Sequence, residues 1–119
     1  MTNQINDGRT SVQELKTIVE EFIQAREWEQ FHSPKNLSMA LAVEAAELMN
    51  IFKWQASEAA WEALNDDKVR QDVEDELADI FVYALAFANR HNIDISSAIR
   101  SKMLKNGEKY PQEKFKGRY

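Results

Sequence analysis

Glycine and proline are scarce in this sequence, and cysteine is absent. The 119 residues include three Gly, two Pro and no Cys, and residues 35–106 contain neither Gly nor Pro. Folds built from strands and tight turns need turn residues more often than this. The same stretch is rich in Ala, Leu, Glu and Lys, which are strong helix formers. The sequence therefore predicts an all-α fold, and the absence of Cys excludes disulfides and thiolate metal ligands.

Long apolar runs are also missing. No segment approaches 18 consecutive apolar residues, so no membrane-spanning helix is expected. Residues 1–7 are polar and lack the apolar core of a signal peptide, which makes a cytoplasmic location the expectation. The length favours a single domain over residues 1–119, with flexible ends at 1–9 and 112–119.

Charge is unevenly distributed along the chain. The formal net charge of −5 disfavours binding to a nucleic-acid polymer. Residues 66–79 hold seven acidic and two basic side chains, whereas residues 100–119 hold seven basic and two acidic ones. One part of the chain is therefore suited to a metal ion and another to an anion.

Apolar periodicity and capping residues divide the chain into helices. The predicted helices span about 12–28, 36–54, 57–64, 67–91 and 95–106, the third of them being short. This pattern predicts a four-helix-bundle-like fold with one extra short helix, and Trp61 is expected to cover the core. The core stripe expected for the helix at 67–91 consists of Val69, Val73, Leu77, Ile80, Ala84 and Phe87.

Two pairs of carboxylates share a spacing of three residues. They are Glu44 with Glu47, and Glu76 with Asp79. Residues three apart lie on one face of a helix. Glu44 falls within the apolar stripe of its helix, and a buried carboxylate is costly unless it is protonated or finds a cation. Acids converging from two helices predict a site for Mg²⁺ or Mn²⁺. The open alternative is that these acids are solvated and pair with lysines.

Aromatic and basic residues supply the other parts of a nucleotide site. A metal held by carboxylates accepts substrate phosphates, which then need cations on the far side, while a nucleobase needs flat apolar faces. Trp28 and Phe31 could alternatively plug the core. The candidate substrate-binding residues are Trp28, His32, Trp54 and Tyr83 around the base and sugar, and Lys102 and Asn106 at the phosphates.

Several short motifs occur in an order that is highly specific when taken together. They are Trp28-Glu29-Gln30-Phe31-His32, Pro34-Lys35-Asn36-Leu37, Glu44-Ala45-Ala46-Glu47, Phe52-Lys53-Trp54, Glu76-Leu77-Ala78-Asp79, Ser101-Lys102-Met103, Asn106 and Tyr110-Pro111. Over residues 12–111 the chain resembles the all-α MazG-like nucleotide pyrophosphohydrolases, and most closely their dCTP pyrophosphatase branch.

The resemblance implies a function and an assembly. It implies Mg²⁺-dependent hydrolysis of a nucleoside triphosphate, preferably dCTP-like, between the α- and β-phosphates, giving a nucleoside monophosphate and pyrophosphate. It further implies a homotetramer whose sites lie near subunit contacts. One departure concerns the family motif EExxE, because its leading acid is Val43 here. This favours the smaller dCTP-type site and leaves the number of metal ions open.

Three other functions fit parts of the sequence. A di-iron carboxylate bundle needs Glu-x-x-His on two helices, and neither acid pair is followed by His at that spacing. A phosphoribosyl-ATP pyrophosphatase belongs to the same superfamily, but the segment at 28–32 argues against it. A non-enzymatic helical oligomerisation module fits the composition, yet it does not explain an acid within an apolar stripe. Base and sugar preference stay open at this point.

Overall fold

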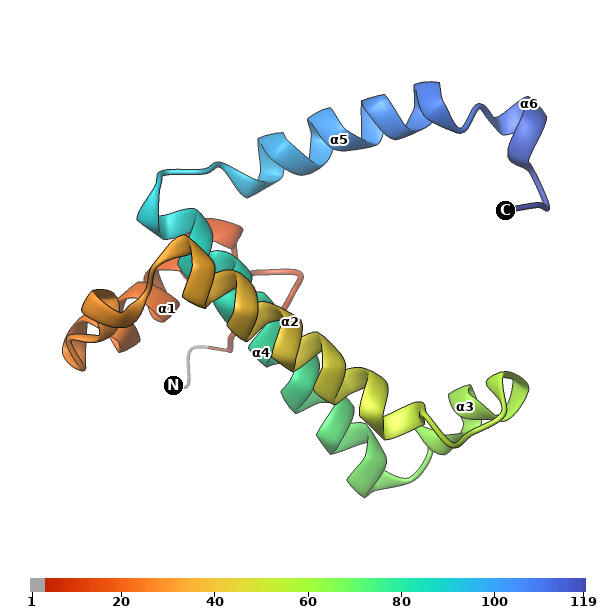
Figure 1. Cartoon of the computed structure of the whole chain (residues 1–119), viewed down its shortest axis with the longest axis horizontal. Coiled ribbons are helices and arrows are strands. Elements are labelled where there is room, and N and C mark those ends of the chain that lie inside the picture. Colours follow the sequence, from red (N-terminus) through yellow and green to blue (C-terminus); the bar gives the residue numbers. More distant parts are fainter. Residues whose placement is uncertain (1–3) are drawn as a thin grey trace.

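A computed structural model describes residues 4–119, and every regular element in that range is helical (Figure 1). The elements are α1 (Val12–Ala25), the 3₁₀ helix η1 (Trp28–Phe31), α2 (Pro34–Phe52), α3 (Ser57–Ala63), α4 (Asp67–Arg90), α5 (Ile95–Lys109) and α6 (Gln112–Phe115). The predicted all-α class is confirmed. In the described part of the chain, each helix is too short or too polar to cross a membrane.

Side-chain caps fix where four of the helices begin. Ser11, Ser33, Asp66 and Asp94 precede α1, α2, α4 and α5, and each accepts a hydrogen bond from a backbone N–H two or three residues further on. Such bonds satisfy N–H groups that have no partner within the helix. The starts of these helices were therefore predictable to within two residues.

Two helix ends differ from the prediction. The first helix ends at Ala25 rather than near Trp28, because Glu27 adopts a left-handed backbone conformation with φ of 53° and the chain turns into η1. In contrast, α5 continues through Gly107 to Lys109. Gln112–Phe115 is a short helix within the stretch expected to be flexible. Flexibility of the two chain ends stays a prediction.

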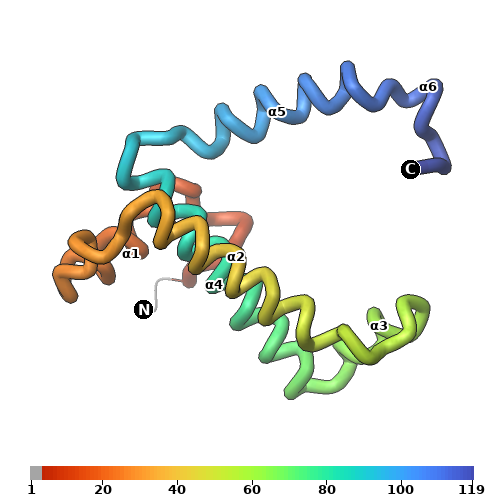
Figure 2. The backbone as a smooth tube through the Cα atoms, in the orientation of Figure 1, coloured from red at the N-terminus to blue at the C-terminus, as the bar shows by residue number. Residues whose placement is uncertain are grey.

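The antiparallel helices α2 and α4 lie side by side along most of their length and form the centre of the molecule (Figures 1 and 2). Helix α1 packs against α4 near one end of the pair, and α3 lies at the other end. The buried core sits where α1, α2 and α4 meet. Its members are Val19, Ile23, Leu37, Leu85 and Ala86.

Helices α5 and α6 leave this core and run apart from it (Figure 1). We call residues 95–119 the arm. Apolar side chains on the arm, including Ile99, Met103 and Leu104, are more than half exposed. The radius of gyration is 17.4 Å, whereas a compact chain of this length has about 13.5 Å. The predicted four-helix bundle is therefore not closed within one chain.

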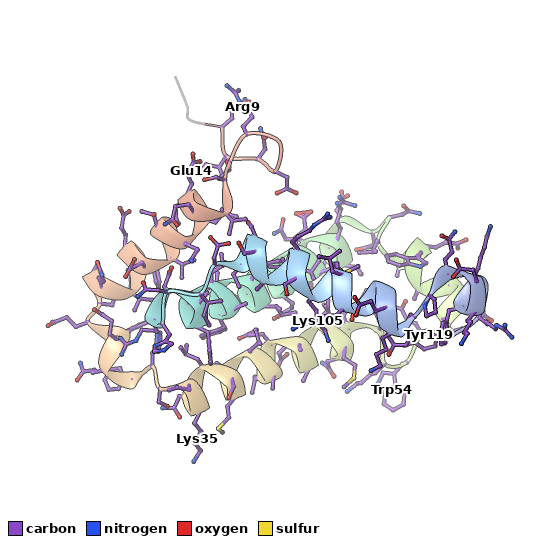
Figure 3. The ribbon with its side chains drawn as sticks, turned by 90° about the horizontal axis from the view of Figure 1, so that it is seen from above. Arg9, Glu14, Lys35, Trp54, Lys105 and Tyr119 are labelled. Atoms are coloured by element: carbon purple, nitrogen blue, oxygen red, sulfur yellow. The ribbon has the colours of Figure 1, made fainter. Side chains whose placement is uncertain are left out.

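Part of the predicted core is wrong. Trp61 is 81% exposed on α3 rather than covering the core. Leu77 and Phe87 of the expected α4 stripe are exposed, while Leu85, Ala86 and Ala88 are buried. The expected stripe assumed one packing partner for α4. Because α1 and α2 both contact α4 and lie on different sides of its C-terminal part (Figure 3), the buried side shifts there.

Candidate functional site

Three carboxylates from the paired helices converge near the middle of α2. Glu44 comes from α2, and Glu76 and Asp79 come from α4. One ligand oxygen from each lies within 4.8 Å of the others. Glu44 and Glu76 are half-buried, whereas Asp79 is exposed. The antiparallel packing of α2 on α4 thus brings together three of the four predicted metal ligands, and we call these three residues the acid cluster.

Crowding of negative charge changes the acidity of Glu44. Its pKa is raised from 4.5 to about 7. The largest cause is a hydrogen bond with Glu76, which only a protonated Glu44 can donate. Partial burial adds to the shift, as do the charges of Asp79, Glu76 and Glu47. Oε2 of Glu76 is buried and has no hydrogen-bond partner among residues 4–119. A divalent cation would satisfy both groups.

The fourth predicted ligand lies beside the acid cluster rather than within it. Glu47 is exposed, yet its charge still raises the pKa of Glu44. Val43, which occupies the place of the leading acid in the family motif, is also exposed. Three of the described carboxylates therefore meet at one point. Their oxygen atoms are hard donors of the kind that Mg²⁺ and Mn²⁺ prefer.

A cavity of about 310 Å³ opens next to the acid cluster, between α1, η1 and α4. Asp79 belongs to both, so the cavity and the carboxylates are adjoining parts of one site. Trp28, His32 and Tyr83, all predicted to bind substrate, line this cavity. The full lining consists of Ile18, Val19, Phe22, Ile23, Trp28, His32, Asp79, Val82 and Tyr83. We call this the aromatic cavity.

Some of the cavity wall was not anticipated from the sequence. Phe22 is absent from the predicted substrate-binding residues, yet it is about half exposed and packs edge-to-face on Trp28 with ring centroids 5.7 Å apart. The guanidinium of Arg26 lies 3.6 Å from the centre of the Phe22 ring. The spacing of four residues between Phe22 and Arg26 was the available signal, because such residues are neighbours on a helix.

The 3₁₀ segment is held in place by two side-chain hydrogen bonds, one from α2 and one from the segment itself. The Nδ2 group of Asn36 donates to the carbonyl of Phe31 at 3.0 Å, and Nε2 of Gln30 donates to the carbonyl of Glu27 at 2.9 Å. Trp28 and Phe31 are exposed, by 41% and 60%. The alternative in which they plug the core is therefore wrong, and the segment instead forms one wall of the aromatic cavity.

A second, larger depression of about 430 Å³ lies on the other side of His32. Its remaining lining is Ser33, Pro34, Leu37, Phe87, Arg90, His91 and Ile93. It contains none of the predicted metal ligands. The smaller aromatic cavity is the better candidate for substrate because it adjoins the acid cluster.

The remaining predicted residues lie away from the acid cluster in a single chain. Trp54 is 89% exposed just beyond the end of α2 and projects outward (Figure 3). Lys102 is exposed on the arm, and Asn106 donates weakly to the sulfur of Met103 at 3.7 Å. Their roles in substrate binding stay predictions, and they need a second subunit if all are to meet one substrate.

The chain is similar to known proteins of one family. Residues 39–118 match the MazG-like family. The dCTP pyrophosphatase 1 proteins of Rattus norvegicus and Homo sapiens are 35% and 34% identical to this chain over 101 residues, which are 85% of this chain and 59% of each relative. The crystal structure of a pyrophosphatase from Archaeoglobus fulgidus superposes with a TM-score of 0.79 at 36% identity, covering 91% of this chain and 99% of that one. The chain belongs to the MazG-like family.

Proposed function

We propose that this chain hydrolyses deoxynucleoside triphosphates, with dCTP preferred, to the nucleoside monophosphate and pyrophosphate. The observation that carries the proposal is the adjacency of the acid cluster and the aromatic cavity through Asp79. One part suits a metal-bound triphosphate and the other a nucleoside. The dCTP and other pyrophosphatases that this chain resembles support the same reaction. The chain spans about 59% of the length of the curated relatives.

The acid cluster is the proposed site of Mg²⁺ or Mn²⁺. Glu44, Glu76 and Asp79 would hold the ion, and Glu47 is the fourth proposed ligand from the adjoining turn of α2. When bound, such an ion neutralises phosphate charge and activates water. Two observations support this assignment: the Glu76 oxygen that lacks a hydrogen-bond partner, and the raised pKa of Glu44. A bound cation would coordinate the oxygen and would stabilise the ionised form of Glu44.

The aromatic cavity is the proposed site of the base and sugar. Stacking of a base on Trp28 or Tyr83 contributes about 1–3 kcal/mol and tolerates every base, so selection must come from fit and hydrogen bonds. An aromatic ring against C2′ of the sugar would reject a ribose hydroxyl. This is the basis for preferring deoxynucleotides, and a cytoplasmic location would supply them.

A homotetramer is the proposed assembly. The exposed apolar side chains of the arm and the large radius of gyration support it, because a chain of this shape leaves a face that another copy can cover. Neighbouring subunits would then carry Lys102 and Asn106 to the phosphates, and Trp54 to the nucleoside. Each site would therefore draw on more than one chain.

The test is a panel of NTPs and dNTPs, together with phosphoribosyl-ATP, with release of pyrophosphate as the readout. We expect turnover with Mg²⁺, none with EDTA, and dCTP ahead of CTP. Trp28→Ala should raise KM for dCTP about tenfold or more, as the loss of stacking predicts. Trp61→Ala is the matched control, because this exposed Trp lies on α3, outside the aromatic cavity.

Each comparison within the panel can overturn a part of the proposal. Equal rates with CTP and dCTP would remove the deoxynucleotide preference. Turnover of phosphoribosyl-ATP alone would favour the related enzyme class. Absence of pyrophosphate with every nucleotide would leave the helical oligomerisation module as the function.

A further inference from the structure

Three side-chain atoms among residues 4–119 are buried without a hydrogen-bond partner. They are Oε2 of Glu76, Oε1 of Glu29 and Nδ1 of His32. The first belongs to the acid cluster, and the other two belong to the 3₁₀ segment and its C-cap. A buried polar group without a hydrogen-bond partner is destabilising, so two such atoms close in sequence call for a joint explanation.

The backbone places Glu29 and His32 on the same edge of the segment. The N–H of His32 donates to the carbonyl of Glu29 at 3.1 Å, which is the three-residue bond of a 3₁₀ turn. With three residues per turn, side chains three positions apart eclipse one another. Both residues also line one small cavity of about 20 Å³. Neither atom has a partner, so the two groups are not bonded directly. A cavity needs about 10–15 Å³ to hold a water molecule, so one water can join them.

The two side-chain amides that line this small cavity are already engaged. The amide of Gln24 donates to Glu20 at 3.3 Å, and the amide of Asn89 donates to the carbonyl of Lys16 at 2.9 Å. The cavity also borders Arg90, which forms no ion pair with Glu29 in the described part of the chain. Arg90 is an exposed residue, whereas Nδ1 of His32 is buried and without a partner, as Oε1 of Glu29 is, so the imidazole is the partner that both unpaired atoms require.

Donor and acceptor chemistry then favours one direction for this contact. A carboxylate only accepts, whereas a neutral imidazole carries one N–H donor and one acceptor nitrogen. The chain in which Nδ1–H donates to the water and the water donates to Glu29 is favoured, because hydrogen bonds in line polarise one another and the carboxylate attracts the proton to the nearer nitrogen. Nε2 then keeps its lone pair. Only Nδ1 of this ring is a buried, unserved atom, and His32 also lines the aromatic cavity with Trp28 and Tyr83. The open nitrogen is thus an acceptor.

We propose that Glu29 is a positioning residue that holds His32 in the Nδ1–H tautomer, so that Nε2 accepts a hydrogen bond from a ligand N–H or O–H in the aromatic cavity. This inference rests on the proposed function for the ligand. The exocyclic amino group of cytosine is such a donor, whereas the corresponding carbonyl of uracil or thymine is not. Glu29 would therefore favour an amino base over a keto base without touching it.

The tautomer can be measured without any substrate. The chain has only two histidines, so ¹⁵N-histidine labelling gives two imidazoles, and His91→Gln assigns them. At alkaline pH, where imidazole is neutral, we expect His32 to show a protonated Nδ1. Glu29→Gln should move the spectrum toward Nε2–H, because an amide can donate to Nδ1. Glu20→Gln is the matched control, since Glu20 lines the same cavity but already accepts from Gln24.

Two results would overturn the positioning role. One is an Nε2–H tautomer in the unmodified protein, and the other is an unchanged His32 spectrum in Glu29→Gln. Should Glu29→Gln fail to fold, Glu29→Asp serves instead. It keeps the carboxylate within reach through one water and should retain the Nδ1–H tautomer, whereas loss of that tautomer in a folded Glu29→Asp would also contradict the proposal.

Kinetics then test the role in recognition. We expect Glu29→Gln to reduce the preference for dCTP over dUTP by roughly tenfold, mainly through KM, as for one hydrogen bond lost. An unchanged ratio in a variant whose tautomer has switched would overturn the recognition role. If the unmodified protein hydrolyses neither nucleotide, the proposed function fails and recognition fails with it. The tautomer is measured on the free protein, so the positioning role of Glu29 is tested independently of the proposed function.

Discussion

The paired helices α2 and α4 and the arm are both amphipathic, but only the pair finds its packing partner within the chain. Leu37 of α2 is 2% exposed, whereas Met103 of the arm is 58% exposed. The apolar spacing in the two regions is of the same kind. An amphipathic pattern therefore shows that a helix has a partner, and it does not show whether that partner lies in the same chain.

The two regions also differ in charge. The pair carries the acid cluster, and the arm carries a surplus of basic side chains that includes Lys102 and Lys105. Lys105 is labelled on α5 in Figure 3. If the proposed function is correct, the pair supplies the reaction centre, whereas the arm supplies assembly and phosphate binding. Substitutions in the two regions should then impair the protein in different ways.

The largest effect is expected from the acid cluster. Asp79→Ala removes a proposed metal ligand and leaves the remaining acids less neutralised, so kcat should fall roughly a hundredfold or more. Circular dichroism should show the helices intact. Asp75→Ala is the control, because Asp75 lies on the same helix and accepts from Gln71 outside the cluster. Activity of Asp79→Ala close to that of the unmodified enzyme would contradict the metal assignment.

The next effect concerns the apolar face of the arm. Met103→Asp places a charge where we propose that another subunit packs, so light scattering should show loss of the tetramer toward the 13.8 kDa chain. Activity should fall with it, since each site is proposed to draw on neighbouring arms. Ser101→Asp adds the same charge on the opposite side of α5 and should leave the mass unchanged. A 13.8 kDa particle for the unmodified protein would refute the tetramer.

A smaller effect is expected from the basic side of the arm. Lys102→Ala should raise KM for the triphosphate about tenfold, as for one charge-assisted contact, while the assembly stays intact. Pyrophosphate release at varied dCTP concentration measures this. If KM stays the same, the phosphates are bound by other groups and the arm serves assembly alone.

The smallest effect concerns stability without metal. Because the pKa of Glu44 is raised from 4.5 to about 7, the folded chain holds this proton more tightly than the unfolded chain does. The stabilisation is complete below pH 4.5 and is lost as the pH rises to about 7. In EDTA, the urea midpoint should fall across this window. In Glu44→Gln the urea midpoint should change less with pH over this window, whereas in the control Lys102→Ala it should change as in the unmodified protein. The same dependence on pH in all three proteins would show that Glu44 is not its cause.

The features that could be predicted from the sequence depend on residues close to one another in the chain. The caps Ser11 and Asp94 act within three residues, and the acid pairs follow from helical spacing together with two neighbouring helices. Trp61 and the direction of α5 were beyond such reasoning. Their surroundings depend on which surfaces meet across the molecule or between molecules, and the spacing of apolar residues carries no information on that.

The separation of the arm from the core has a consequence for biogenesis. The subunit is built from helices whose hydrogen bonds close within a few residues, and chains of this kind fold within about microseconds to milliseconds. In the proposed tetramer, association of subunits would wait for encounters and would slow as the chain becomes more dilute. A newly made chain would then spend most of the time before assembly folded, with the apolar side of α5 uncovered. We expect that interval, rather than folding itself, to set its risk of aggregation.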